Sequence, residues 1–292
     1  MSGCRLLCAI QPSALPSTDP LFMYRRLKNK LNRERRRSQR RSVPLQPDNT
    51  FSAGGGIAWY EPVLAGPATF ARDCSGEAAL TGVIPILEQL AADDYLNFTL
   101  RFYQAGLKQY GARWHYADIT TVLYGVCCNL RVESYLEVGV RRGRSLAVVG
   151  ALCPTAHLVG FDMWIPDYGA AENPGPAFVQ QELARVGHRG KLELVSGNSR
   201  TTVPDFFRRN TSIYFDLITI DGDHSARGAR MDLEHAIPRL KVGGVLVFDD
   251  ICNPDHRYLR DVWTRVVAGG DRFLTTVFEE PGYGVALAVK KW

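Results

Sequence analysis

The stretch FDLITIDGDHSARGARMDLEHAIPRLKVGGVLVFDDI (residues 215–251) contains two short apolar runs on either side of a helix-like segment. The runs at 215–220 and 244–250 are rich in β-branched residues, which favours strands. Between them, apolar residues recur at helical intervals, and KVGG at 241–244 indicates where that helix ends. Two apolar strands joined by a helix predict a parallel pair with a crossover connection.

Three further runs of this kind lie upstream, at 134–140, 158–163 and 191–196. Each is followed by a segment long enough for a crossover, and such near-continuous apolar strands indicate a parallel sheet that is covered on both faces. At the C-terminal end, RFLTTVFEE (272–280) and GVALAVKK (284–291) are joined by a tight turn, so one of them must run antiparallel. We predict an α/β fold with a mostly parallel seven-stranded sheet and an antiparallel terminal hairpin strand.

The formal charge of +5 is unevenly distributed along the 292 residues. Residues 25–41, RRLKNKLNRERRRSQRR, carry a net charge of +9, whereas residues 42–292 carry −4. We expect 1–50 to be a basic mobile tail, which is either simply solvated or binds an anionic surface such as lipid or nucleic acid.

The segment between this tail and the first predicted strand has a helical pattern. We expect SAGGGIAWYEP (52–62) to be a flexible joint, followed by two or three helices over 78–108 and another over 117–130. The predicted organisation is therefore a helical N-terminal or cap region at 51–115 and the sheet domain at 116–292.

The seven cysteines are scattered and show no spacing typical of a zinc site. We interpret them as reduced core thiols of a cytoplasmic protein. The apolar run LLCAI near the N-terminus is only five residues long, so we expect neither secretion nor a transmembrane segment.

Polar residues and glycines follow the first three predicted strands. In open parallel sheets, ligands bind beyond the carboxyl ends of the strands. Gly139 and Gly143 in LEVGVRRGRS form either a ligand-binding turn or an ordinary strand-to-helix turn. Asp162, about twenty residues on, can accept both hydroxyl groups of a ribose. In SGNS (196–199), the polar atoms either face an adenine or cap the next helix.

An acidic cluster follows the fourth and fifth strands. IDGDH ends in Asp221, Asp223 and His224, and VFDDI contains Asp249 and Asp250. Carboxylates that converge at the edge of a sheet repel one another unless they are protonated or bind a cation, and oxygen ligands suit Mg²⁺, Mn²⁺ or Ca²⁺. We expect Asp223 to be a helix cap and the other three carboxylates to hold a metal ion.

Together, YLEVGVRRGRSLA, VGFDMW, GNS and the stretch 215–251 resemble class I S-adenosylmethionine-dependent methyltransferases, which have a Rossmann-like fold. The resemblance covers 116–292 and is greatest to the small-molecule branch that includes macrolide-sugar O-methyltransferases and cephalosporin-biosynthesis methyltransferase-like proteins. It implies that 116–292 binds S-adenosylmethionine. The implied cofactor-binding residues are Glu137, Gly139, Gly143, Asp162, Ser199 and Asp221. The implied metal ligands are Asp221, Asp249 and Asp250, with His224 as the catalytic base. The glycine turn reads E-x-G-x-x-x-G in place of the fuller motif, and Asn198 stands where an acidic residue is frequent.

The expected reaction is O-methylation of a hydroxylated small molecule, such as a sugar or glycoside, assisted by Mg²⁺ or another divalent cation. The loop MWIPDYGAAENPGPAF (163–178) has the composition of a substrate lid, in which Trp164 and Tyr168 either stack on a ring or simply pack.

Two other functions fit part of the pattern. A nicotinamide-dependent oxidoreductase shares the glycine turn and the ribose carboxylate, although it normally has G-x-G-x-x-G. A non-enzymatic cofactor-binding or nucleic-acid-binding protein would depend on the basic tail. The sequence leaves the methyl acceptor, the choice of metal and the oligomeric state open.

Overall fold

The computed structural model describes residues 50–53, 57–60, 65–166, 173–279 and 282–292. All of them belong to one compact unit, Gln46–Trp292. The predicted basic tail lies outside the described residues except for Thr50, and so does Tyr168.

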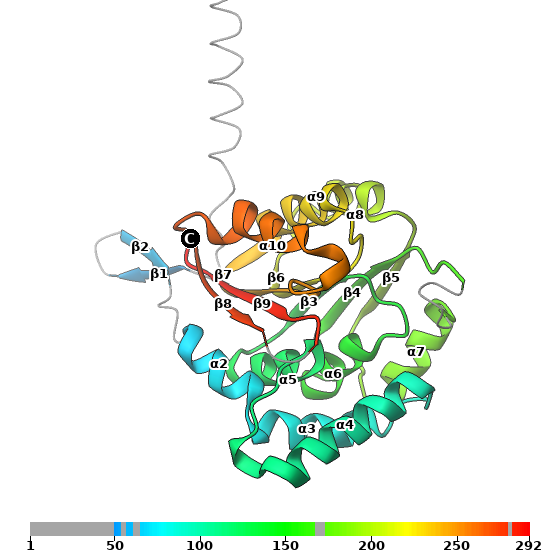
Figure 1. Ribbon diagram of the computed structural model, residues 1–292. Helices are drawn as coiled ribbons and strands as arrows, with labels where there is room; N and C mark the ends of the chain where they lie inside the picture. The colour runs from blue at the N-terminus through cyan, green and yellow to red at the C-terminus, as the bar shows by residue number, and fades with distance from the viewer. Residues whose placement is uncertain (1–49, 54–56, 61–64, 167–172, 280–281) are drawn as a thin grey trace, which may run out of the picture. The chain divides into compact units, whose positions relative to one another are not determined.

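Seven strands form one sheet in the order β5-β4-β3-β6-β7-β9-β8 (Figure 1). Their bounds are β3 (Ser134–Val138), β4 (His157–Asp162), β5 (Leu192–Ser196), β6 (Phe215–Ile220), β7 (Leu240–Phe248), β8 (Phe273–Phe278) and β9 (Val285–Lys290). Neighbouring strands are parallel except where β9 pairs antiparallel with β7 and with β8. The predicted fold class, with its antiparallel terminal hairpin strand, is confirmed.

Helices cover both faces of the sheet (Figure 1). One face carries α2 (Pro67–Ser75), α3 (Glu77–Leu87), α4 (Asp94–Tyr110), α5 (Ile119–Asn129), α6 (Arg144–Leu152) and α7 (Pro176–Arg185). The other carries α8 (Ser199–Arg209), α9 (Ala226–Ala236) and α10 (Tyr258–Trp263). Along β3 the side chains alternate between the two cores, with Tyr135 in one and Leu136 in the other.

Polar side chains fix several helix starts that position the site. Asp118 accepts hydrogen bonds from the N–H groups of Thr120 and Thr121, and Thr121 in turn accepts one from the Asp118 N–H, which makes a capping box for α5. Asp93 caps α4, and Asn198 of the SGNS segment caps α8, which is the capping alternative for that segment.

Two local predictions are wrong. KVGG does not follow a helix end directly, because α9 gives way to a 3₁₀ turn (Ile237–Arg239) and β7 already begins at Leu240. Pro238 in that turn has no N–H to continue the α-helix. The predicted joint at 52–62 contains two strands, β1 (Thr50–Ala53) and β2 (Ile57–Tyr60), which pair antiparallel. The pattern also missed α2, although Pro67 at its first turn is a typical start signal.

The five described cysteines are free, but Cys128 is exposed, so the prediction of core thiols is wrong for that residue. Within the described ranges, every helix lacks the length or the apolar character needed to cross a membrane.

The order of the strands determines where a ligand can bind. The chain runs from β3 outward to β4 and β5, and then returns to β6 on the other side of β3. The crevice beyond the carboxyl ends of β3 and β6 is therefore the topological switch point, the usual ligand site of such sheets. Gly139 is the first residue after β3, and Asp221 is the first residue after β6.

Candidate active site

The turn after β3 approaches the end of β6 very closely. Gly139 has φ +95°, and a Cβ atom there would lie 2.0 Å from the carbonyl oxygen of Asp221. Only glycine can occupy this position without displacing the neighbouring backbone. Gly143 has φ +76° and lies at the N-cap of α6. The two predicted glycines therefore lie where the N-terminus of α6 and the end of β6 come close together.

Glu137 lies beneath this turn and is fully buried. Its carboxyl group accepts hydrogen bonds from the hydroxyl groups of Tyr135 (3.0 Å) and Ser145. The Tyr135 hydroxyl oxygen also forms a hydrogen bond with the Thr219 hydroxyl group on β6, at 2.9 Å. Burial raises the pKa of Glu137 to about 8, although both hydrogen bonds oppose the shift. The side chain predicted to contact the cofactor thus joins β3 to the first turn of α6.

Asp162, at the end of β4, orients two backbone segments. Its Oδ2 accepts a hydrogen bond from the Arg141 N–H at 2.7 Å, and its Oδ1 accepts one from the Trp164 N–H at 2.5 Å. Arg141 (φ +52°) and Trp164 (φ +44°) both have the left-handed backbone that is uncommon outside glycine. The predicted ribose acceptor is therefore held by backbone groups against the turn at 139–143, the predicted cofactor turn.

Ser199 is the first residue of α8. Its side chain lies near the buried Asp232 of α9, whose pKa burial raises to about 6. The Asn198 side chain accepts a hydrogen bond from the Arg200 N–H at 3.0 Å. The polar atoms after β5 are thus engaged within the fold, and the adenine contact of Ser199 stays a prediction.

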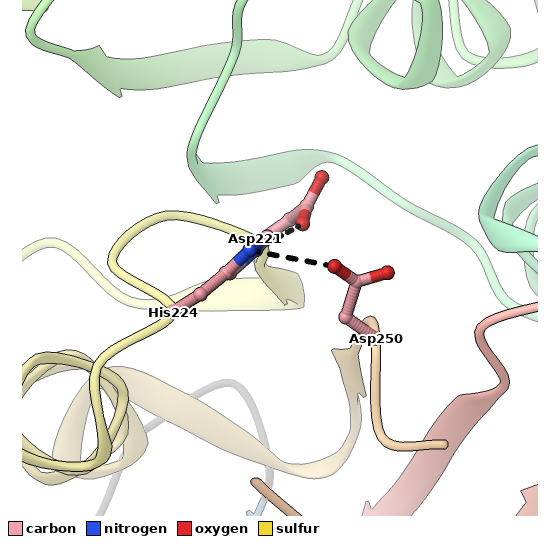
Figure 2. Close-up of side chains that lie close together, drawn as sticks. All are labelled: Asp221, His224 and Asp250. Atoms are coloured by element: carbon pink, nitrogen blue, oxygen red, sulfur yellow. Dashed lines mark hydrogen bonds and ion pairs between the residues drawn. The ribbon is translucent and has the colours of Figure 1, made fainter. Parts of the chain in front are cut away.

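Asp221, His224 and Asp250 lie together beyond the ends of β6 and β7, as Figure 2 shows. The His224 Nε2 atom lies 3.3 Å from Asp221 Oδ1, and its Nδ1 atom lies 3.4 Å from Asp250 Oδ2. One potential ligand atom from each of the three residues lies within 4.8 Å of the others. The imidazole is therefore between two of the three predicted metal ligands.

The titration behaviour of this group follows from its charges. The hydrogen bond with Asp221 raises the pKa of His224, and partial burial opposes the shift. Partial burial raises the pKa of Asp221, and the hydrogen bond with His224 opposes it. Two neighbouring carboxylates favour the imidazolium form of His224.

Asp249 is the third predicted metal ligand, and it is not part of the compact three-residue group. Its backbone N–H donates to the Ile220 carbonyl at 3.2 Å, so residue 249 still lies at the end of β6. Burial, together with the charges of Asp221 and Asp250, raises its pKa well above the ordinary value. Such crowding of carboxylates is relieved by a proton or by a cation.

The backbone around Asp250 is supported by the turn that follows β7. Asp250 has φ +60°, and its carbonyl and carboxylate oxygens accept hydrogen bonds from the N–H (3.1 Å) and the side-chain amide (3.2 Å) of Asn253. Asn253 is buried and also caps the 3₁₀ turn η5 (Pro254–His256). The His256 ring lies 5.3 Å from that of His224, measured between centroids. Sequence reasoning missed both residues, although an Asn three positions after Asp250 is a typical turn signal.

Asp223 is not the helix cap that the sequence predicted. Ser225 caps α9 by accepting a hydrogen bond from the Gly228 N–H at 3.0 Å. Asp223 accepts one from the Ser225 N–H at 2.8 Å and forms an ion pair with Arg200 at 2.5 Å. The N-cap of α9 is therefore residue 225 and not residue 223, because the Asp223 side chain pairs with Arg200 and links the loop to α8.

Trp164 packs against the core that lies under α2 to α7, which is the packing alternative for this residue. Its neighbours Met163 and Ile165 are exposed. The central part of the predicted lid, 167–172, lies outside the described residues.

A family model described as a methyltransferase domain matches residues 136–251. The match extends from β3 to just beyond β7 and includes all of the predicted site residues. No curated protein matches the sequence significantly.

Several solved structures are similar to this chain. CalS11, a TDP-rhamnose 3′-O-methyltransferase of calicheamicin biosynthesis, is 23% identical over 73% of this chain and 93% of its own, with a TM-score of 0.48. TomG from Streptomyces achromogenes, in complex with S-adenosylmethionine, is 18% identical over 74% and 91%, with a TM-score of 0.47. An O-methyltransferase from Bacillus cereus is 16% identical over 74% and 91%, with a TM-score of 0.48.

The sequence of residues 136–251 matches the family model, and the strand pairing gives the sheet order described above. Together they show that residues 136–251 form a domain that is similar to a methyltransferase domain, as the resemblance of the sequence predicted.

Proposed function

We propose that the protein is an O-methyltransferase that methylates a hydroxylated small molecule, such as a sugar or glycoside, with the assistance of a divalent cation. The observation that carries the proposal is the position of His224 between Asp221 and Asp250, at the switch point where Gly139 contacts the Asp221 backbone. This arrangement combines a proton acceptor, a set of carboxylates and a cofactor turn within one crevice.

The residues have complementary roles in this reaction. An alcohol attacks the sulfonium methyl group poorly until it loses its proton. His224 in its neutral form accepts that proton, and the adjacent carboxylates stabilise the imidazolium that results. Asp162 and the turn at 139–143 hold the cofactor, so that the methyl group faces the incoming oxygen.

The donor set fits a hard divalent cation. Asp221, Asp249 and Asp250 would hold it, since carboxylate oxygens are the preferred ligands of Mg²⁺ and Mn²⁺. The raised pKa of Asp249 beside two other carboxylates supports this role, because a cation would offset their repulsion. When bound, the cation would lower the pKa of the acceptor hydroxyl and orient it.

The acceptor class rests on the resemblance of the sequence to the sugar O-methyltransferase branch. The helices at 65–110 pack in the same core as α5 and α6, which supports a role as a cap region beside the methyltransferase domain. We propose that the loop 163–178 contributes to the acceptor side of the site, as its composition predicts.

The test is methyl transfer by the full-length chain. The protein is incubated with methyl-labelled S-adenosylmethionine and a panel of glycosides, phenols and primary amines, with Mg²⁺ or with excess chelator, and products are detected by mass spectrometry. We expect label on hydroxyl oxygens, only with the metal. Transfer only to the amines would contradict the O-methyl assignment. Oxidation of the panel with NAD⁺ would favour the nicotinamide alternative, and salt-dependent nucleic-acid binding without any turnover would favour the non-enzymatic one.

A further inference from the structure

A single carboxylate joins the start of α4 to the cofactor turn. Asp93 caps α4, with its Oδ1 accepting a hydrogen bond from the Leu96 N–H at 2.8 Å. Its Oδ2 forms ion pairs with Arg142 Nε at 2.8 Å and with Arg144 Nη2. Arg142 belongs to the turn between β3 and α6, and Arg144 is the first residue of α6. The contact thus spans about fifty residues of sequence.

Both arginines are largely shielded from solvent. The side chain of Arg142 is 7% exposed, and its guanidinium lies 4.5 Å from the centroid of the Phe178 ring at α7. The guanidinium of Arg144 lies 5.2 Å from the centroid of the Tyr95 ring on α4. Ion pairs in such surroundings are weakened by water and salt much less than pairs on the surface.

The segment before Asp93 is anchored as well. The Ala91 N–H donates a hydrogen bond to Glu182 Oε2 at 2.9 Å. Glu182, on α7, is 2% exposed, and its other oxygen lies 3.1 Å from Arg185 Nε. Residues 91–93 are therefore fixed to α7 at one end and to the cofactor turn at the other.

The ion pairs act on the part of the turn that is conformationally constrained. Arg142 lies between Arg141 (φ +52°) and Gly143 (φ +76°), and the Arg141 N–H donates to Asp162. A shift of the Arg142 side chain would move this N–H relative to the carboxylate that is expected to bind the ribose. We propose that Asp93 is a positioning residue for the cofactor turn, and that cofactor binding is coupled through it to the start of α4.

The proposal rests on the cofactor site described above, and coupling of this kind is reciprocal. If Asp93 favours the turn conformation that binds the cofactor, then bound cofactor must stabilise the contacts of Asp93 by the same factor. We therefore expect S-adenosylhomocysteine to slow amide hydrogen exchange at 91–97, a segment that belongs to α4 and its connection.

The test compares two variants that make the same chemical change one residue apart. Asp93→Asn removes the charge that pairs with both arginines and keeps a good helix cap. Asp94→Asn removes an exposed charge from the same helical turn. By calorimetry, we expect Asp93→Asn to weaken S-adenosylhomocysteine binding by about 5- to 30-fold, within the usual range for such coupling, whereas Asp94→Asn stays near wild type.

Hydrogen exchange then separates positioning from a general loss of stability. We expect the cofactor-induced protection of 91–97 to be present in the wild type and in Asp94→Asn, and to be lost in Asp93→Asn while protection at the loop after β4 is retained. Wild-type affinity in Asp93→Asn, or undiminished protection of 91–97, would overturn the proposal.

A second variant keeps the test decisive if Asp93→Asn does not fold. Arg144→Gln removes one of the two ion pairs and leaves the other, and should weaken binding in the same direction with partial loss of protection at 91–97. Unchanged binding in Arg144→Gln would then overturn the proposal. If the wild type binds no S-adenosylhomocysteine, the assignment of the cofactor site is wrong, and the proposal that depends on it is wrong as well.

Discussion

The Nε2 atom of His224 lies 3.3 Å from Oδ1 of Asp221, the residue that directly follows β6. Its Nδ1 atom lies 3.4 Å from Asp250 Oδ2, so both ring nitrogens face carboxylates. The hydrogen bond with Asp221 raises the pKa of the imidazole, and a base must be neutral to accept a proton. The neutral form of His224, which the proposed base role requires, is therefore populated at higher pH than that of an ordinary histidine.

The first prediction concerns this pH dependence. For the wild type, we expect the turnover rate to rise with pH along a limb centred above the usual histidine value of about 6.5. His224→Ala should lower turnover by about 100- to 10,000-fold and remove that limb, with little change in cofactor affinity. His157→Ala, at the opposite end of β4, is the control and should retain the limb. A His224 variant with the wild-type profile would assign the proton transfer to another group.

The second prediction concerns the divalent cation. Exhaustive chelation should abolish turnover, and Mg²⁺ or Mn²⁺ should restore it, because the carboxylates after β6 and β7 are the proposed ligand set. Asp250→Asn should behave like the chelated enzyme, whereas Asp255→Asn, an exposed change in the following turn, should not. Full activity in excess chelator would exclude the metal from the mechanism.

The third prediction distinguishes the two candidates for the third ligand. Carboxylate oxygen is a better ligand than imidazole for a hard cation. We therefore expect Asp249→Asn to weaken Mn²⁺ binding by about tenfold or more, a loss typical of a removed charged contact, and His224→Ala to weaken it much less. Titration followed by electron paramagnetic resonance measures both affinities. The reverse ranking would make His224 a ligand and would leave Asp249 as a neighbouring charge.

The fourth prediction concerns the cofactor. Asp162→Ala removes the expected ribose acceptor and should weaken S-adenosylhomocysteine binding by about 10- to 100-fold in calorimetry, which corresponds to about 1.5–3 kcal/mol. Asp205→Ala, an exposed change on α8, serves as the matched control. Equal affinities of the two variants would contradict the assignment of Asp162 as the ribose acceptor.

The fifth prediction uses the buried Glu137. Its pKa of about 8 means that the folded protein binds this proton more tightly than the unfolded chain does. Stability should therefore fall as the pH rises from about 4.3, the unfolded value, to about 8. Glu137→Gln cannot ionise, so its free energy of unfolding relative to wild type should increase by up to about 1.4 kcal/mol per pH unit in this window. Denaturant titrations at several pH values measure the difference, and a flat difference would contradict the raised pKa.

Local patterns in the sequence were sufficient for the fold class and for the membership of the sheet. The apolar runs predicted every strand from β3 to β9, because strand periodicity and crossover length are properties of short segments. The same patterns failed where pairing decides the structure. β7 begins at Leu240 because it pairs with Phe215 before a shift in register, and the two strands at 50–60 pair with each other.

The approximate composition of the site could also be predicted, because the carboxyl ends of parallel strands meet at one edge. That rule brings Gly139, Asp162, Asp221 and Asp250 to one crevice, whichever way their side chains point. It does not say that Asp223 pairs with Arg200, or that Ser199 lies near Asp232. Both pairs of residues are distant in the sequence, and no local sequence pattern predicts that they lie close together.

Only the tertiary structure decided which side chains touch. His224 lies between Asp221 and Asp250 because Asp250 has a left-handed backbone that Asn253 supports. Asp93 reaches Arg142 because α4 packs beside the cofactor turn. Side-chain direction depends on a few backbone angles and on packing between distant segments, and neither is encoded in the periodicity of apolar residues.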